Sequence, residues 1–282
     1  MTSTTGAESL RAIAGDYDAF FLDQFGVVHD GSSAYPGAAE AVAALADLGK
    51  PVVFVTNSGR PAAFNEARLA RLGVPRETYL ACVTSGDVAI QLCEDGVFPL
   101  PEDRRIRCLT ISSLDDYNLS DRLGCVRTES GKDADLLVIA GSQADTIPMS
   151  DYEAMMRPAA ERGVACICTN PDRHMLTPSG LVPSAGAIAD LYAELGGPVT
   201  FVGKPHPEIY EAAFALIPGV EKRRILCVGD SIDHDIAGAA AFGAAAALVR
   251  TGILADVDRA EIDGRLASAG VTVDHILPAL RW

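Results

Sequence analysis

Three aspartates of this chain lie in patterns that are typical of a metal site. Asp23 ends the apolar run in FFLDQFGVVHDG (20–31), and Asp230 and Asp235 lie in GDSIDHDIAGA (229–239). Carboxylates that converge repel one another, and at about 4 Å with an effective dielectric constant near 20 each like pair costs roughly 4 kcal/mol. A divalent cation offsets this repulsion, and ligands that are all oxygen favour Mg²⁺, which also binds waters and substrate phosphate. The pattern therefore predicts a Mg²⁺ site that handles phosphate.

Two further polar residues end apolar runs and suit the binding of an anion. Thr56 ends FVTN, where a hydroxyl and backbone N–H groups near a helix start are a good phosphate cradle. Lys204 ends the run in VGKPHPE, and the chain has only four lysines, so ordinary surface solvation explains it poorly. Each residue alone is more often a cap or a surface group. The ordered set of Asp, Thr, Lys and the paired aspartates is what indicates a phosphate centre.

Apolar runs alternate with helical stretches, and this alternation predicts the elements that position these residues. Strands are predicted at 18–25, 51–57, 198–205, 223–230 and 245–252, with helices at 36–49, 63–73, 206–217 and 234–243, and residues 80–96 as strand, turn and helix. Such a pattern predicts a Rossmann-like, doubly wound parallel sheet covered on both faces. Ligands bind beyond the carboxyl ends of the strands in such sheets. The polar residues there are Asp23, Thr56–Asn57, Thr84–Ser85, Lys204 and Asp230.

The middle of the chain also alternates between strands and helices. The runs RIRCLTIS, ADLLVIAGS and VACICTN accompany the helical stretch DYEAMMRPAAERG. We therefore predict an α/β core formed by residues 1–86 and 181–282, with residues 87–180 as an inserted α/β domain. The C-terminal VDHILPALRW is predicted to be a short apolar tail packed on the core.

Composition limits the classes of partner and compartment. The formal net charge of −15 disfavours nucleic acid and anionic membrane, both of which need a positive footprint. The seven cysteines have no Cys-x-x-Cys spacing and mostly lie in apolar runs, which predicts reduced thiols in a cytoplasmic protein. The N-terminus lacks the pattern of a signal peptide, and no apolar run is long enough for a transmembrane helix.

Four segments together resemble the haloacid dehalogenase superfamily, class IIA, the group of NagD-like and nitrophenyl-phosphatase-like hydrolases. They are LDQFGVVHDGSSAYPGA, FVTNSGRP, VGKPHPEIY and VGDSIDHDIAGA, in the family's order, and they span most of the chain. The long interval between Thr56 and Lys204 matches the place where this class inserts its cap domain. The segment CTNPDRHML (168–176) resembles a cap-side motif of these proteins.

The resemblance implies a role for each matching residue. Asp23 would attack phosphorus and form an aspartyl phosphate, Thr56 would bind the transferring phosphoryl group, and Lys204 would pair with both. Asp230 would bind Mg²⁺ directly, Asp235 would support the metal site, and the backbone carbonyl of Phe25 would be a further ligand. Candidates for contact with phosphate or substrate are Asn57, Ser58, Gly59 and Arg60 after the second motif, and Asn170, Asp172 and His174 on the cap side.

Phe25 is a departure from the family pattern, which has a second aspartate at this place. That acid protonates the leaving alcohol and then activates water, and the loss of such a group typically costs about 10²- to 10⁴-fold. Three interpretations stay open: a phosphatase for aryl or acyl phosphates, replacement of the acid by His29, His206 or His234, or a regulatory module that only binds phosphate ligands. Phosphonate cleavage or phosphoryl transfer to another acceptor is a further alternative.

The inserted domain implies a small phosphorylated metabolite as substrate, because a cap that closes over the site disfavours bulky polymers. The resemblance also implies a possible homodimer. We therefore expect a Mg²⁺-dependent phosphatase that acts through Asp23 with a weakened or substituted general acid.

Overall fold

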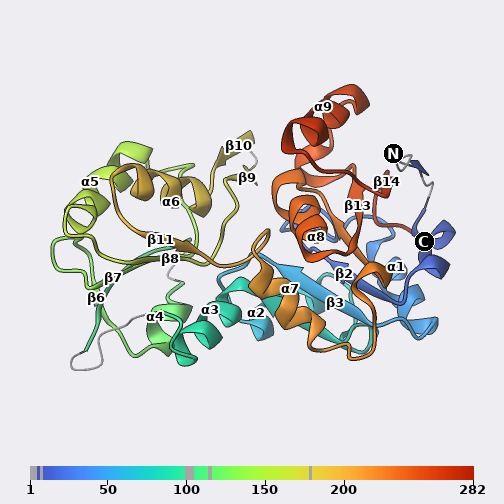
Figure 1. Cartoon of the computed structure of the whole chain (residues 1–282), viewed down its shortest axis with the longest axis horizontal. Helices are drawn as coiled ribbons and strands as arrows, with labels where there is room; N and C mark the ends of the chain where they lie inside the picture. Colours follow the sequence, from blue (N-terminus) through green and yellow to red (C-terminus); the bar gives the residue numbers. More distant parts are fainter. Residues whose placement is uncertain (1–4, 7–8, 99–104, 114–115, 178–179) are drawn as a thin grey trace. The chain divides into compact units, whose positions relative to one another are not determined.

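The chain forms two compact units in a computed structural model that describes residues 5–6, 9–98, 105–113, 116–177 and 180–282 (Figure 1). The first unit comprises Met1–Thr56, Ala62–Val83 and Lys204–Trp282. The second unit comprises Asn57–Pro61 and Thr84–Gly203.

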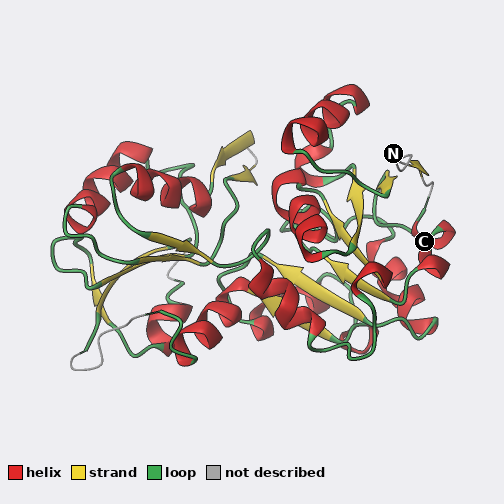
Figure 2. Cartoon of the chain, in the orientation of Figure 1, coloured by secondary structure: helices red, strands yellow, loops and turns green. Residues whose placement is uncertain are grey.

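A seven-stranded sheet forms the centre of the first unit (Figure 2). Its order is β1 (Thr5–Gly6), β14 (His275–Leu277), β13 (Ala245–Val249), β12 (Ile225–Gly229), β2 (Ala19–Leu22), β3 (Val52–Thr56) and β4 (Ala81–Thr84). Strand β2 pairs in parallel with β12 on one side and with β3 on the other. Every residue of β2, β3 and β12 is buried, as expected of central parallel strands covered on both faces.

Helices cover both faces of this sheet, and the side chains of β2 show which helix packs on which face. Phe20 and Leu22 join a core cluster that contains residues of α1 (Ala38–Asp47) and α2 (Ala62–Arg71). Phe21 points the other way and packs on Phe242 of α8 (Ala237–Phe242), with ring centroids 6.4 Å apart. The other α-helices among the described residues of this unit are α7 (Pro207–Phe214) and α9 (Arg259–Ala269).

The second unit is built on a five-stranded sheet. Its order is β11 (Val199–Phe201), β8 (Cys166–Cys168), β7 (Leu136–Ile139), β5 (Arg107–Ile111) and β6 (Val126–Thr128), with all pairs parallel. The antiparallel hairpin of β9 (His174–Thr177) and β10 (Gly180–Pro183) is separate from this sheet. The α-helices of the second unit are α3 (Ser85–Glu94), α4 (Asn118–Arg122), α5 (Met149–Ala160) and α6 (Ala185–Glu194).

The edges of the second unit differ from the domain boundaries predicted at residues 87 and 180. The run at 198–205 was expected in the core sheet, but β11 pairs with β8 of the second sheet. Helix α6 belongs to the same core cluster as α5, so the second unit extends to Gly203. Because β11 pairs with β8 and α6 packs with α5, residues 181–203 belong to the second unit. The predicted assignment of these residues to the core was wrong.

The C-terminal segment is also different from the expected apolar tail. His275–Leu277 forms β14, which pairs in parallel with β13 and carries the short strand β1 on its other edge. The apolar packing was expected correctly, because Leu277 and Leu280 are fully buried in the core of the first unit and Trp282 packs against it.

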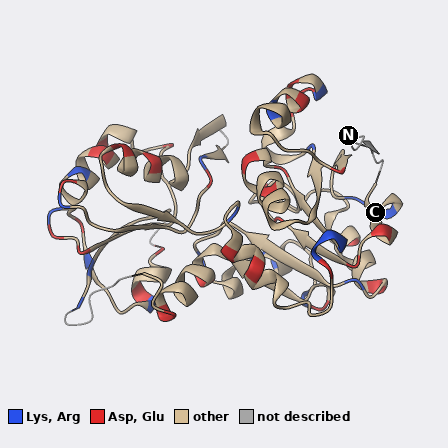
Figure 3. Ribbon diagram, in the orientation of Figure 1, with Lys and Arg blue, Asp and Glu red and all other residues tan. Residues whose placement is uncertain are grey.

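Charged side chains are spread over the helices and loops of both units (Figure 3). Among the described residues, all seven cysteines are free thiols. No helix in the described ranges combines the length and the apolar character needed to cross a bilayer.

Candidate active site

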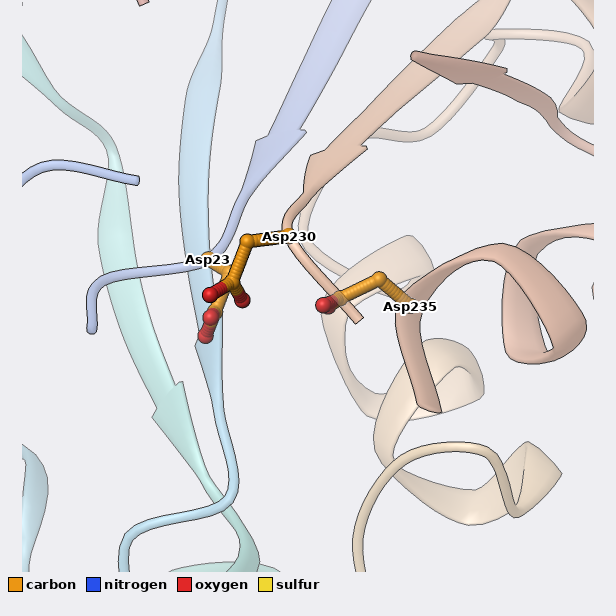
Figure 4. A group of neighbouring side chains, drawn as sticks. All are labelled: Asp23, Asp230 and Asp235. Carbon is orange, nitrogen blue, oxygen red and sulfur yellow. The ribbon is translucent and has the colours of Figure 1, made fainter. Parts of the chain in front are cut away.

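Three carboxylates converge at the carboxyl ends of the central strands (Figure 4). Asp23 follows β2 and Asp230 follows β12, and these strands are neighbours because Leu22 lies opposite Val228. Asp235 comes from the turn before α8. One oxygen from each carboxylate lies within 4.8 Å of the others. The structure thus brings together the three aspartates that the sequence singled out.

Asp235 is positioned by a single turn of π-helix, Ile232–Ile236. Its Oδ2 accepts a hydrogen bond of 3.1 Å from the backbone N–H of Ser231, and its own N–H donates to the Ser231 carbonyl at 3.0 Å. A Cβ added to Gly229 would lie 2.0 Å from Cγ of Asp235. The glycine before Asp230 is therefore required for Asp235 to fold back toward the strand ends.

Lys204 connects two of the carboxylates. Its Nζ lies 2.6 Å from Oδ1 of Asp23 and 2.7 Å from Oδ1 of Asp235, and its side chain is only 5% exposed. Charged donors and acceptors at such distances form strong hydrogen bonds. Both oxygens of Asp235 are thus engaged, by Lys204 and by Ser231, which fits a supporting role better than direct metal ligation.

The charges of this cluster fit a divalent cation. Three carboxylates and one ammonium leave two negative charges in a largely buried place. Burial is the main cause that raises the pKa of Asp230 well above its ordinary value, and the charges of Asp23 and Asp235 raise it further. A cation held by Asp23 and Asp230 would remove this penalty, and oxygen ligands of this kind suit Mg²⁺.

Loss of the Lys204 ammonium is expected to destabilise the first unit. In Lys204→Met the charges of Asp23 and Asp235 lose their common partner, and breaking a buried ion pair typically costs about 3–5 kcal/mol. Urea unfolding of the metal-free protein at pH 7 measures this cost. The control Lys222→Met removes a lysine that pairs with Glu211 at a more exposed position and should change stability by less than about 1 kcal/mol. Equal losses in the two variants would contradict the prediction.

Thr56 lies at the end of β3, next to the strand that leads to Asp23. It is 7% exposed, and the register places Phe54 opposite Leu22, so both strands end on the same side of the sheet. Thr56 therefore lies at the same carboxyl ends of the strands as the three aspartates.

The loop after β2 holds Phe25 and His29 together. Their rings meet edge to face with centroids 5.8 Å apart. Nδ1 of His29 accepts a 3.0 Å hydrogen bond from the N–H of Gly31, so the ring proton is on Nε2. This Nε2 is buried without a hydrogen-bond partner among the described residues. Such an internal imidazole is a poor replacement for the missing acid.

Burial and the nearby positive charge of Arg68 lower the pKa of His29 to about 4. Unfolded His titrates near pH 6.5, so between about pH 6.5 and 4 the unfolded chain binds a proton that the folded chain does not. Stability is therefore expected to fall by about 3 kcal/mol as the pH drops through this range, and to be fully present above it. Urea unfolding of wild type and His29→Gln between pH 7 and 4 checks this. The variant should lose less stability than wild type, and the exposed control His174→Gln should behave like wild type.

The residues after Thr56 are anchored within the second unit. Nδ2 of Asn57 donates to Oδ1 of Asp172 at 2.8 Å, and the Ser58 carbonyl accepts from the Ser85 hydroxyl at 3.0 Å. A Cβ on Gly59 would lie 2.8 Å from Oγ1 of Thr169. Asn57 to Gly59 are thus closely packed against their own unit.

Arg60 also has protein partners. Its Nε lies 3.4 Å from Oδ2 of Asp116, and its Nη2 donates to the Ser113 carbonyl at 3.3 Å. These contacts hold the Arg60 side chain within the second unit. Its contact with substrate stays a prediction.

The segment Asn170–His174 forms a turn. Oδ1 of Asn170 accepts from the N–H of Asp172 at 3.1 Å, which is the turn chemistry expected of Asn two residues before its partner. His174 begins β9 and is exposed. The structure links Asp172 to Asn57, but it assigns no ligand to these three residues.

Two other histidines are candidate general acids. His206 immediately precedes α7, and His234 lies in the π-turn with Nδ1 2.9 Å from Oγ of Ser231. Their roles stay predictions. The backbone N–H of Ile253 also donates to Oδ2 of Asp230 at 2.9 Å, a contact that no side-chain motif indicates. The glycine before it, Gly252, was the only available signal.

Comparison with known proteins agrees with this geometry. Residues 20–116 match the model of the haloacid dehalogenase-like hydrolase family, and residues 201–280 match a second model described as HAD-hydrolase-like. A sugar-phosphatase, AraL of Bacillus subtilis (strain 168), is 29% identical over 237 residues, which is 82% of each chain.

Solved structures of the family extend over nearly the whole chain. A haloacid dehalogenase-like hydrolase from Brucella suis 1330 is 31% identical, with a TM-score of 0.81 over 97% of this chain and 99% of that one. The glycerol phosphate phosphatase Rv1692 of Mycobacterium tuberculosis, solved in complex with calcium, is 27% identical, with a TM-score of 0.63 over 86% of this chain and 68% of that one. The sequence motifs, the converging carboxylates with their lysine, and this agreement in fold lead to one assignment: the chain belongs to the haloacid dehalogenase-like hydrolases, in class IIA.

Proposed function

We propose that this protein is a Mg²⁺-dependent phosphatase that hydrolyses a small phosphorylated metabolite through an aspartyl phosphate at Asp23. The observation that carries the proposal is the position of the Lys204 ammonium, 2.6 Å from Asp23 and 2.7 Å from Asp235. It pairs with the Asp23 carboxylate and orients it at the strand ends, as a nucleophile requires. Two of the named relatives are a sugar-phosphatase and a glycerol phosphate phosphatase, which supports a small phosphate monoester as the substrate class.

The first half of the reaction transfers the phosphoryl group to the enzyme. A carboxylate oxygen of Asp23 attacks phosphorus, and the bond between phosphorus and the ester oxygen breaks. Lys204 and the hydroxyl of Thr56 stabilise the charge on the phosphoryl oxygens, since positioned donors account for much of catalysis in phosphoryl transfer. A Mg²⁺ ion held by Asp23, Asp230 and the carbonyl of Phe25 would supply further positive charge at these oxygens.

The second half returns the enzyme to its starting state. Water attacks phosphorus, the bond to Asp23 breaks, and inorganic phosphate leaves. Phe25 can neither protonate the leaving alcohol nor take a proton from this water. The proposal therefore includes a restricted range of substrates, with aryl and acyl phosphates favoured because their leaving groups depart without protonation.

Phosphate release tests the proposal. Wild-type protein is assayed with p-nitrophenyl phosphate, acetyl phosphate and a panel of sugar and glycerol phosphates, with Mg²⁺ and with EDTA. We expect release that requires Mg²⁺ and is faster for aryl and acyl phosphates than for alkyl phosphates. If no substrate is hydrolysed while phosphate still binds, the chain is a module that binds phosphate ligands. If phosphate appears on an added alcohol instead of in solution, phosphoryl transfer is the reaction.

A further inference from the structure

The loop after β13 contacts two parts of the metal site, the Asp230 carboxylate and the backbone that follows Asp23. Three consecutive residues make these contacts. Oγ1 of Thr251 donates to the carbonyl of Gly26 at 2.5 Å, and the N–H of Ile253 donates to Oδ2 of Asp230 at 2.9 Å. Between them, the backbone of Gly252 packs against Oδ2 of Asp230 and Cα of Gly26. We call residues 251–253 the clamp, because they hold Asp230 and the loop after Asp23 at the same time.

The backbone of two glycines packs directly against the Asp230 carboxylate. Gly26 has a φ of +85° and Gly252 a φ of +59°, both in the region that favours glycine. A Cβ on Gly26 would lie 2.0 Å from Oδ2 of Asp230, and a Cβ on Gly252 would lie 1.9 Å from the same oxygen and 2.6 Å from Cα of Gly26. Two backbone segments therefore enclose the Asp230 carboxylate.

Thr251 is the only one of the three clamp residues whose contact in this site is made by a side chain, so it is the one that a substitution can test. Its hydroxyl holds the carbonyl of Gly26, in the peptide between Gly26 and Val27. The peptide immediately before it carries the carbonyl of Phe25, which is a proposed ligand. Partners that orient the groups around a metal typically contribute 10- to 100-fold to its affinity. Loss of the hydroxyl should release the loop and separate the ligands.

We infer that Thr251 is a positioning residue for the divalent cation: through the clamp it holds the Phe25–Gly26 backbone and the Asp230 carboxylate at the spacing that the ion requires. The inference rests on the proposed function only in taking Asp23, Asp230 and the carbonyl of Phe25 as the ligands. Residue 251 lies outside the four motifs that identified the family.

The test measures binding of Mg²⁺ to the protein without substrate, by isothermal titration calorimetry. Thr251→Val keeps the shape and removes the donor, and we expect 10- to 100-fold weaker Mg²⁺ binding. Thr251→Ser keeps the donor and should bind within about threefold of wild type. The matched control is Thr78→Val, which removes a similar bond, from Oγ1 to the Pro75 carbonyl at 2.7 Å, before β4 and thus at the opposite ends of the strands.

The outcomes separate this inference from the proposed function. If Thr251→Val binds Mg²⁺ as wild type does, or if Thr78→Val weakens binding equally, Thr251 has no positioning role. A wild-type protein that binds no Mg²⁺ also overturns the inference. If Mg²⁺ binding depends on Thr251 as expected but no phosphate ester is hydrolysed, the inference holds and the phosphatase proposal fails.

Discussion

Asp23→Asn is expected to lower kcat for phosphate release by about 10⁶-fold, the order of loss found when an enzyme loses its covalent nucleophile. The amide has nearly the same shape as the carboxylate but does not attack phosphorus. The variant should nevertheless fold. One of three mutually repelling charges is removed, and Lys204 keeps its 2.7 Å contact with Asp235. We therefore expect the metal-free variant to be at least as stable as metal-free wild type, although its kcat is far lower.

Phosphate release and urea unfolding, measured on the same samples, separate these two effects. The control is Asp18→Asn, which removes an aspartate at the other end of β2 whose carboxylate pairs with Arg224 at 2.9 Å. It should retain full activity. Asp23-independent release at more than about a hundredth of the wild-type rate would show that another group attacks phosphorus.

Phe25→Asp is expected to accelerate hydrolysis of alkyl phosphates by about 10²- to 10⁴-fold, the contribution of a positioned general acid–base group. The new carboxyl would protonate the leaving alcohol in the first step and take a proton from water in the second. The gain should be smaller for p-nitrophenyl phosphate, because nitrophenolate leaves without a proton. The ratio of kcat/KM for glycerol phosphate to that for p-nitrophenyl phosphate is the measurement.

The control for this change is Phe25→Asn, which has the size of Asp but no titratable proton. It also removes the ring contact with His29, so it reports what the loss of that packing does to stability. Similar rates for Phe25→Asp and Phe25→Asn on alkyl phosphates would mean that the absence of an acid does not limit this enzyme.

The sequence was sufficient to predict the parts of the fold whose signals are local. The buried runs that became β2, β3 and β12 are continuous apolar segments that end in polar residues, and parallel sheets place such ends together. The sequence therefore predicts the grouping of Asp23, Asp230 and Asp235, and the structure brings the three together.

Pairing between distant strands was not predictable in the same way. The run that became β11 is apolar whichever sheet it joins, and only its register with β8 decides the matter. Likewise, the C-terminal residues of β14 are as apolar as a packed tail, and a three-residue strand has too few positions to show a period.

In the site, too, some contacts can be predicted from the sequence and others cannot. Side-chain ligands left a pattern, whereas the contact from Ile253 to Asp230 is made by a backbone N–H that every residue except proline carries. The enclosure of the carboxylate depends on two glycines, and a glycine in a loop has many ordinary explanations.

The order of strands in the first unit also bears on how the chain folds during synthesis. Strand β2 lies between β3 and β12, and β12 is made about 200 residues after β2. Until β12 has been synthesised, one edge of β2 exposes unpaired backbone N–H and C=O groups that can pair with an incorrect strand. Most of the second unit, Thr84–Gly203, is continuous in sequence and is complete before β12 leaves the ribosome. Asp23 thus acquires its neighbours Lys204 and Asp230 only after Thr84–Gly203 has been made, so the half-sheet of β2 and β3 is the stage most exposed to wrong pairing.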